Sequence, residues 1–310
     1  MIKLSGITPS GHIHAGNHLG AVRRWAAEGG PDDLYFVSDL HAMTTSHNPA
    51  RLRSLATEQL AVLVATGISP EQVFVQSDLA RELGALTWVL ECTCSFGEAA
   101  RMIQFKEKSE GQAGVRLSLL TYPVLMAADI LLQGAAQVPV GEDQRQHVEL
   151  ARTLARRFNS TYGEVFTVPQ AVLPPSGARV MDLSDPTRKM SKSTRDSAGV
   201  VFMLDEPDQV RRKIRRAVTD DGSGAGPGVA NLLEILAACG GSVAESSSYG
   251  ALKDAVADAL IEELRPVRTR TLELLDDVAE LDRIRKAGAA RAAERGSHRL
   301  SSALRLIGAG

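Results

Sequence analysis

The sequence IKLSGITPSGHIHAGN, residues 2–17, joins a short β-prone segment to a polar turn that contains glycine. A helical stretch follows it, with Leu19, Val22 and Trp25 on one face. A strand that leads through such a turn into a helix points free backbone N–H groups and the positive helix end at whatever lies above the sheet. An anionic phosphate fits this position, although Gly-rich turns before helices are common and a purely structural turn explains the same residues.

Short β-prone segments alternate with helical stretches as far as about residue 175. After the first segment, the β-prone segments lie at residues 33–39, 73–77, 135–141 and 164–169. The stretches 50–67 and 142–158 carry apolar residues at helical spacing. This alternation is typical of a parallel sheet covered by crossover helices, so we predict an α/β fold with a Rossmann-like sheet.

The second part of the chain has no strand signals. From about residue 206, amphipathic helices are predicted at 207–218, 229–239, 249–264 and 266–280, followed by a short Ala- and Arg-rich run. We therefore predict a Rossmann-like catalytic domain over residues 1–185, a loop over 186–198 and an all-helical domain over 199–310. The last helix could pack back on the first domain.

The composition excludes several classes of protein. The 310 residues include 35 Lys and Arg against 37 Asp and Glu, so the chain is not a globally basic nucleic-acid coat. No apolar run approaches the roughly 20 residues of a spanning helix and no signal peptide is evident, so we expect a cytoplasmic protein without membrane contact. Three cysteines without a second C-x-x-C pair indicate neither disulfides nor zinc, and we expect buried free thiols.

A second polar segment, Lys189-Met190-Ser191-Lys192-Ser193, has neither a helical nor a strand period. Two lysines three residues apart on a loop of small residues can converge on a polyanion, and a mobile loop can engage phosphates as charge develops on them. A solvated basic linker between domains explains the same composition.

Together, the two segments resemble the signature motifs of class I aminoacyl-tRNA synthetases. His14-Ala15-Gly16-Asn17 stands in the place of the HIGH motif, and residues 189–193 spell KMSKS in full. The segments TYP-x-LMAADILL at 121–132, VPVGEDQ-x-QH at 138–147 and RFN-x-x-YGE at 157–164 resemble the tryptophan branch of that family, in which Asn in place of the last His is usual. The resemblance implies activation of L-tryptophan with ATP and its transfer to tRNA(Trp).

Asp129 is the only charged residue in the apolar segment 119–132, and a buried carboxylate is unfavourable unless it is paired. A helix cap, an arginine partner or exposure would satisfy it without any function. By the resemblance, Asp129 accepts the indole N–H, which phenylalanine lacks. The resemblance places further residues around tryptophan: Met126, Ile130, Val138 and Val140 against the ring, Tyr122 and Gln144 near the ammonium, His41 near the carboxylate, and Gly6.

The resemblance also implies a nucleotide site. Its expected members are Thr8, Pro9, Ser10, Gly16, Asn17, Gly141, Glu142, Asp143, the backbone at Val180, and Lys189, Met190, Ser191, Lys192 and Ser193. His14 is expected to hold phosphate, while Lys108, Lys189 and Lys192 neutralise the leaving pyrophosphate. We expect Mg²⁺ to bind through the ATP phosphates and no protein metal site. Lys108 could instead be a solvated charge, and the carboxylates at 142 and 143 an ordinary helix cap.

Two positions depart from the family pattern. Thr8 stands where many bacterial relatives have Gln, and the strand at 35–41 is one residue shorter than usual, which brings Ser38 near the indole pocket. The basic cluster 211–216 could contact tRNA phosphates or be a solvated helix face. Family members are homodimers that share a tRNA. The open alternatives are a tyrosine-specific relative, a HIGH-type nucleotidyltransferase such as pantothenate synthetase, and a non-catalytic tRNA-binding paralogue.

Overall fold

The computed structural model describes residues 1–103, 105, 114–173, 179–191, 197–219, 226–242 and 248–309. Within them, two groups of parallel strands form the sheet: β1 (Leu4–Ile7), β2 (Leu34–Val37) and β3 (Val73–Val75), and β4 (Gln137–Pro139) with β5 (Gln170–Val172). A parallel bridge between Lys3 and Gln137 joins the groups, so the strand order is β3-β2-β1-β4-β5. The predicted α/β fold with a Rossmann-like parallel sheet is confirmed.

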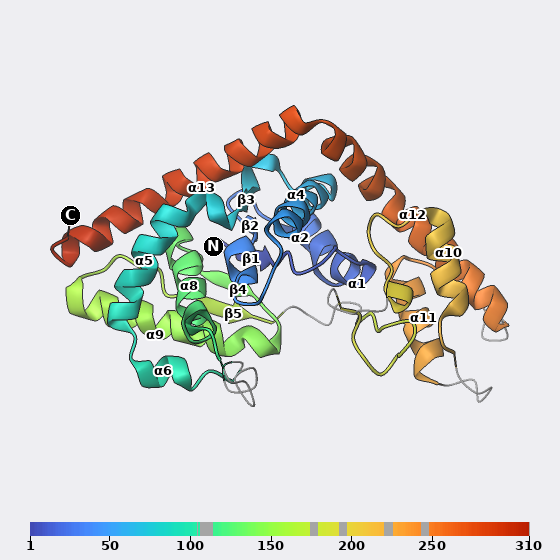
Figure 1. The fold of residues 1–310 in the computed structure, drawn as a ribbon, viewed down its shortest axis with the longest axis horizontal. Coiled ribbons are helices and arrows are strands. Elements are labelled where there is room, and N and C mark those ends of the chain that lie inside the picture. The colour runs from blue at the N-terminus through green and yellow to red at the C-terminus, as the bar shows by residue number, and fades with distance from the viewer. Residues whose placement is uncertain are drawn as a thin grey trace.

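Helices cover both faces of the sheet (Figure 1). On one face lie α1 (Ala15–Asn17), a π-helical turn (His18–Val22), α2 (Arg23–Glu28) and α4 (Pro49–Ala65). On the other lie α5 (Ala80–Thr93), α8 (Leu117–Gln133) and α9 (Arg145–Tyr162). The side chains of β2 alternate between the two cores: Tyr35 and Val37 join the first, and Leu34 and Phe36 the second. Short helices α3 (Asp39–Ala42) and α6 (Phe96–Ala100) lie in the connections.

The second part of the described chain is all helical, as predicted. It contains α10 (Pro207–Arg216), α11 (Pro227–Ala238), α12 (Tyr249–Asp276) and α13 (Val278–Leu306). The predicted break before Pro266 is wrong, because buried Leu264 and Val267 on either side hold α12 in the core and proline removes only one helical N–H. The chain turns instead at Asp277, whose side chain accepts the Glu280 N–H and begins α13, a 29-residue helix where a short run was expected.

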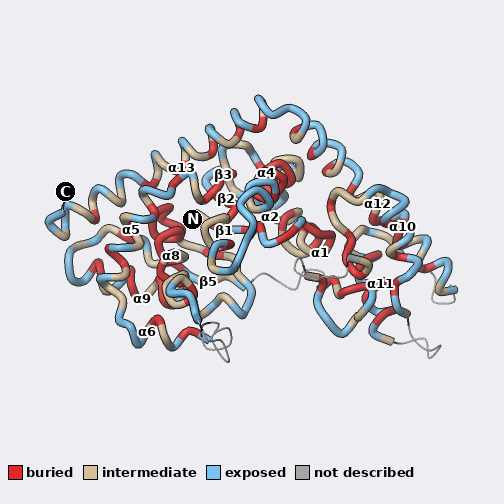
Figure 2. The backbone as a smooth tube through the Cα atoms, viewed as in Figure 1, coloured by how far each residue is buried: buried red, intermediate tan, exposed pale blue. Residues whose placement is uncertain are grey.

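The long helix α13 returns across the first domain and packs against α5, α8 and β3 (Figure 1). Gly288 allows its closest approach, since a Cβ there would lie 1.7 Å from the Val73 carbonyl oxygen. Arg285 adds a two-pronged ion pair with Asp78 at the end of β3. Figure 2 shows buried positions recurring along the length of α13.

The strand predicted at 164–169 is also wrong. The Asn159 side chain accepts the backbone N–H groups of Val165 and Phe166 at 3.1 and 3.0 Å and donates to the Phe166 carbonyl at 2.8 Å. These bonds occupy backbone groups that a strand would pair with its neighbour. The last described strand therefore forms only after Pro169, at Gln170–Val172.

Two expectations from composition have different outcomes. All three cysteines are free, as predicted, but their expected burial is wrong: Cys92 is exposed on α5, and Cys94 and Cys239 are half-buried. No helix among the described residues is long and apolar enough to cross a membrane.

Candidate functional site

A cavity of about 340 Å³ lies between β1, β2, β4 and α8. Its lining includes all nine residues that the sequence predicts for the amino acid pocket: Gly6, His41, Tyr122, Met126, Asp129, Ile130, Val138, Val140 and Gln144. These residues come from segments up to 138 positions apart, between Gly6 and Gln144, and the parallel sheet brings them together. Thr8 and Ser38 also line the cavity, and the sequence did not single out the remaining lining residues, Leu4, Ser5, Phe36, Thr44 and Pro139.

The Asp129 carboxylate is 3% exposed and has two side-chain partners. His41 Nε2 lies 2.9 Å from Oδ2, and Gln76 Nε2 donates to both carboxylate oxygens at 2.9 Å. Burial raises the pKa of Asp129, while the hydrogen bonds from His41 and Gln76 oppose the rise. His41, which the resemblance assigns to the substrate carboxylate, therefore contacts Asp129 in this structure.

Gln76 is a site residue that sequence reasoning missed. It is fully buried, and its Oε1 accepts the backbone N–H groups of Leu40 and His41 at 3.1 and 3.3 Å. Because Oε1 is held by two donors, Nε2 can only face Asp129. The available signal was its position directly after β3, at the carboxyl end of a parallel strand, where ligand-binding groups of α/β proteins gather.

At the other end of the cavity, four polar side chains form a chain of hydrogen bonds. The Tyr122 hydroxyl lies 3.0 Å from His147 Nε2, and His147 Nδ1 lies 2.9 Å from Gln144 Oε1. Gln144 Nε2 donates to Asp143 Oδ2 at 2.8 Å. Burial, together with the charge of Asp143, raises the pKa of Tyr122 to about 12, so this phenol keeps its proton at neutral pH. His147 is 1% exposed, and the sequence did not single it out.

The two departures from the family pattern meet in the cavity wall. Thr8 Oγ1 lies 2.9 Å from Ser38 Oγ, and both residues line the cavity. Ser38 is buried at the end of β2, and Thr8 follows β1 directly. This pair joins the amino acid pocket to the Thr8-Pro9-Ser10 turn that the sequence assigns to the nucleotide.

The turn into the first helix is fixed by a reciprocal cap. His14 Nδ1 accepts the Asn17 N–H at 3.2 Å, and Asn17 Oδ1 accepts the His14 N–H at 3.3 Å. Since Nδ1 accepts, the neutral His14 ring carries its proton on Nε2. A Cβ on Gly16 would lie 3.1 Å from His14 Nδ1 and 3.3 Å from Val180 Cβ, so a side chain here would crowd both neighbours.

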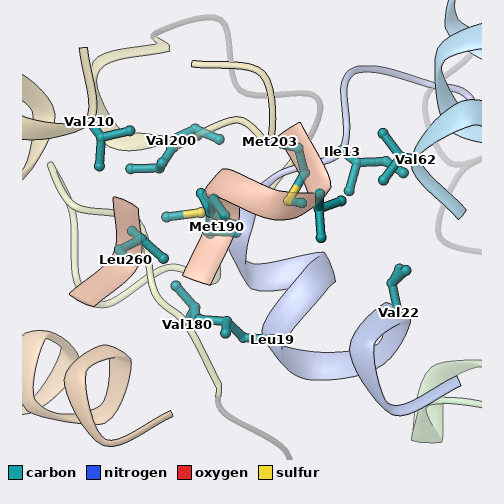
Figure 3. Close-up of a cluster of buried hydrophobic side chains, with 14 of the residues drawn as sticks. Ile13, Leu19, Val22, Val62, Val180, Met190, Val200, Met203, Val210 and Leu260 are labelled. Carbon is teal, nitrogen blue, oxygen red and sulfur yellow. The ribbon is translucent and has the colours of Figure 1, made fainter. Parts of the chain in front are cut away.

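Each signature segment makes a backbone hydrogen bond to a neighbouring loop, and both contribute to one core. The Ala15 N–H donates to the Val201 carbonyl at 2.8 Å, and the Met190 N–H donates to the Val180 carbonyl at 3.1 Å. Leu19, Val180 and Met190 belong to one cluster of buried side chains (Figure 3). The structure thus anchors the KMSKS segment through Met190 beside the first helix.

The other residues predicted to bind the nucleotide are mostly exposed or lie outside the described residues. Gly141 and the short 3-10 helix Glu142–Gln144 precede α9 and are largely exposed. The Lys189 side chain is exposed, and Ser191 is half-buried. Lys108, Lys192 and Ser193 lie outside the described residues.

Comparison with known proteins gives consistent matches along the chain. The family model "tRNA synthetases class I (W and Y)" matches residues 1–280. Tryptophan–tRNA ligase 1 of Streptomyces coelicolor is 51% identical, over 98% of this chain and 96% of that protein. The tryptophanyl-tRNA synthetase structure of Mycoplasma pneumoniae has a TM-score of 0.86 at 33% identity, covering 100% of this chain and 98% of that one. The Campylobacter jejuni tryptophanyl-tRNA synthetase, solved with ADP and tryptophan, has a TM-score of 0.86 at 29% identity, covering 99% and 100%.

Proposed function

The chain belongs to the class I tRNA synthetases of the tryptophan and tyrosine type, and we infer that it acts as a tryptophan–tRNA ligase. It activates L-tryptophan with ATP, which gives tryptophanyl-adenylate and pyrophosphate, and then transfers tryptophan to the 3′ end of tRNA(Trp). Within the structure, the observation that carries this function is the buried Asp129 carboxylate in the wall of a cavity that also has apolar lining residues.

We propose that Asp129 accepts the indole N–H. Met126, Ile130, Val138 and Val140 supply apolar surface in the same cavity, which suits the rest of the ring. A carboxylate can only accept, and indole N–H can only donate, so the two are complementary. A phenyl ring would leave the carboxylate without this donor, and a site built around a buried polar group rejects such analogues strongly.

Activation is an in-line attack of the tryptophan carboxylate on the α-phosphorus of ATP, in which the bond to pyrophosphate breaks. This step requires positioning and stabilisation of charge more than a protein nucleophile. We propose that His14 Nε2–H and the Lys189 ammonium contact the phosphates, together with Lys108 and Lys192. The remaining proposed nucleotide contacts are Thr8, Pro9, Ser10, Gly16, Asn17, Gly141, Glu142, Asp143, Val180, Met190, Ser191 and Ser193.

We propose that Mg²⁺ binds together with ATP, through the phosphate oxygens. The described residues contain no group of three or more His, Cys, Asp or Glu side chains that could hold a metal ion. The oxygen donors that suit Mg²⁺ are then those of the ATP phosphates, as in many nucleotide-dependent enzymes. When bound there, the ion neutralises charge on the phosphates.

We propose that residues 1–185 bind tryptophan and ATP, that 186–198 form the KMSKS loop, and that 199–310 form the anticodon-binding domain. All residues that line the cavity lie before residue 145, which supports the first assignment. In α10, Arg211 and Lys213 pair with Asp258 and Asp205 at 2.6 Å. Contact of this helix with tRNA phosphates would therefore depend mainly on its exposed residues, such as Arg212. Because tRNA is charged where it is used, the proposal includes a cytoplasmic location.

We further propose a homodimer formed through the side of the first domain that carries α5 and the start of α8. Trp88 and Met43 are 68% and 47% exposed and line one groove with the first turn of α8. Phe96 and Leu117, at 76% and 73% exposed, add apolar surface on α6 and α8. Large exposed apolar side chains gathered in one region are typical of protein–protein contacts.

Exchange of pyrophosphate with ATP, measured with each of the twenty amino acids in turn, tests this function. We expect exchange with tryptophan alone. Exchange with tyrosine would identify a tyrosine-specific relative, and no exchange with any amino acid would identify a tRNA-binding paralogue. Charging of tRNA(Trp) by the same preparation then tests the transfer step.

A further inference from the structure

The hydrogen-bond chain from Tyr122 through His147 and Gln144 to Asp143 has a fixed direction, which begins at its charged end. An ionised carboxylate can only accept, so Gln144 must turn its NH₂ group toward Asp143 and its Oε1 toward His147. Oε1 can only accept, so His147 carries its proton on Nδ1. In the neutral ring Nε2 is then an acceptor, and the Tyr122 hydroxyl must donate to it.

The direction of this chain determines what Tyr122 offers to the cavity. Because its proton is donated to His147, the phenolic oxygen can act toward other groups only as an acceptor, and Tyr122 lines the cavity. Hydrogen bonds in such a chain polarise one another, and the carboxylate at its far end increases the negative character of the phenolic oxygen. An acceptor of this kind suits a cationic donor such as an α-ammonium group.

The His147 ring is buried and bonded on both sides, which fixes its orientation toward Tyr122. It is 1% exposed, it lies at the start of α9, and it makes a T-shaped contact with the Tyr122 ring at a centroid distance of 5.2 Å and an angle of 75°. Both of its ring nitrogens have a hydrogen-bond partner, at 2.9 and 3.0 Å. A histidine is the side chain that can accept at one end and donate at the other over this distance.

We propose that His147 is a positioning residue that fixes the Tyr122 hydroxyl as an acceptor for the α-ammonium group of the substrate, and thereby makes the cavity select amino acids over analogues that lack this ammonium group. The inference rests on the proposed function, because it takes tryptophan as the ligand. It assigns His147 no contact with the substrate. It also links the ammonium end of the pocket to Asp143, in the turn assigned to the nucleotide.

The test compares tryptophan with indole-3-propionate, which has the same ring and carboxylate but no ammonium group. In His147→Phe, which keeps an aromatic ring against Tyr122, we expect the Kd for tryptophan to rise about 10- to 100-fold, as loss of a charge-assisted hydrogen bond would give. The Kd for indole-3-propionate should stay within about twofold of wild type, since the ring site is intact. Isothermal titration calorimetry measures both.

Three controls separate positioning from a general loss of structure. His298→Phe makes the same change on the exposed surface of α13 and should change neither Kd. Adding His147→Phe to Tyr122→Phe should have little further effect on tryptophan binding, because the hydroxyl that it orients is already gone. In pyrophosphate exchange, His147→Phe should raise KM for tryptophan much more than it lowers kcat.

Equal loss of both ligands in His147→Phe, or unchanged preference for tryptophan, would overturn the proposal. If the phenylalanine variant does not fold, His147→Asn tests the same prediction. Asparagine can still donate to Gln144 but no longer reaches Tyr122. It should show the same selective loss. Wild-type exchange with tryptophan is measured first, so failure of the proposed function is distinguished from failure of this inference.

Discussion

Single residues in the cavity are held by partners from distant parts of the chain. Asp129 depends on Gln76, which is 53 positions earlier, and on His41, which is 88 positions earlier. Without these two donors, a carboxylate that is 3% exposed would be unpaired and strongly unfavourable. The bonds from Gln76 and His41 also hold the Asp129 carboxylate in a fixed position, where it can accept a hydrogen bond from a ligand in the pocket.

Replacing Asp129 with asparagine should lower kcat/KM for tryptophan about 10- to 100-fold, because a hydrogen bond to a charged group contributes about 1.5 to 3 kcal/mol. Selectivity against phenylalanine should narrow in the same proportion. Pyrophosphate exchange with both amino acids measures the change. Asp282→Asn, on the exposed surface of α13, is the control, and identical selectivity in Asp129→Asn and wild type would rule out the indole contact.

The same variant has a predicted dependence on pH. Burial raises the pKa of Asp129, so the folded protein binds this proton at higher pH than the unfolded chain does. The stability that comes from the protonated form is fully present below the unfolded pKa and is lost as the pH rises through the folded pKa. Wild type alone loses it, so the Tm of Asp129→Asn relative to wild type should rise as the pH increases above the usual range of an aspartate carboxyl group. A constant difference in Tm across this range would contradict the expected direction.

Individual site residues could be predicted from the sequence where their neighbours along the chain mark them. Asp129 could be singled out because it is one charge among apolar neighbours, and the pocket lining followed from motifs of the family. Gln76 had a positional signal directly after β3, but its bonds to Asp129, and those of His147 to Tyr122, cross between elements and are not encoded in spacing along the chain. Lys108, Lys192 and Ser193 remain predictions.

Contacts between elements decide how the helical part is attached. Small residues on α13 let its backbone approach the sheet and α8: a Cβ on Gly296 would lie 2.7 Å from Leu132 Cγ. On the other side, Glu263 of α12 accepts from His18 at 3.0 Å and from Arg23 at 2.9 Å, which ties α12 to the first helices. The two long helices therefore hold the first domain from two directions.

Gly288→Ala should destabilise the protein by about 1 to 3 kcal/mol, because the added methyl group would overlap the Val73 carbonyl and force α13 away from β3. Gly250→Ala is the matched control in α12, where a Cβ meets only Ser248 Oγ at 3.8 Å. It should be neutral or stabilising by up to about 1 kcal/mol. Urea denaturation measures the free energy of unfolding of both variants. Equal effects of the two substitutions would contradict a close contact between Gly288 and the Val73 carbonyl.

Glu263→Gln should lower the free energy of unfolding by about 1 kcal/mol, since the site is partly solvated and screening weakens the pair. The hydrogen bond with His18 lowers the pKa of Glu263, with a further contribution from Arg23. This stability is therefore present above the usual glutamate range and is lost as the pH falls through the folded pKa, where variant and wild type should converge. The adjacent Glu262→Gln, which is exposed and pairs with Arg265, should have little effect when urea denaturation is measured at the same pH values.

Element boundaries show where patterns are insufficient. Helical periodicity located α4, α9, α10 and α11 to within a few residues. It did not show that α12 continues through Pro266, because core packing on both sides of a proline outweighs its local preference. Nor did β-propensity reveal that Asn159 takes the backbone bonds of the segment 164–169.

At the scale of the whole molecule, the two parts of the chain share one hydrophobic core. Buried residues from the first helix, the KMSKS segment and α12 meet in it, among them Leu19, Met190 and Leu260 (Figure 3). The sequence predicted the parts and their order, but alternating patterns describe each element separately. They do not show which apolar faces meet, so the common core could not be predicted.

Trp88→Glu should dissociate the proposed homodimer, because a charge would be buried in the apolar contact. Sedimentation velocity should show the wild type as a dimer and the variant as a monomer that keeps its fold by circular dichroism. Val278→Glu is the control, since Val278 is 73% exposed at the junction of α12 and α13, away from the proposed surface. A monomeric wild type, or a variant that remains dimeric, would exclude this surface.

The contact of α13 with β3 bears on how the protein is made. Among the described residues, strand β3 is the outer strand on its side of the sheet, and the helix that packs on it follows it far along the chain. A nascent chain that has emerged beyond β3 but not yet through α13 therefore has an uncovered outer strand, a state prone to pairing with other chains. Docking of α13 is the step that covers this strand during synthesis.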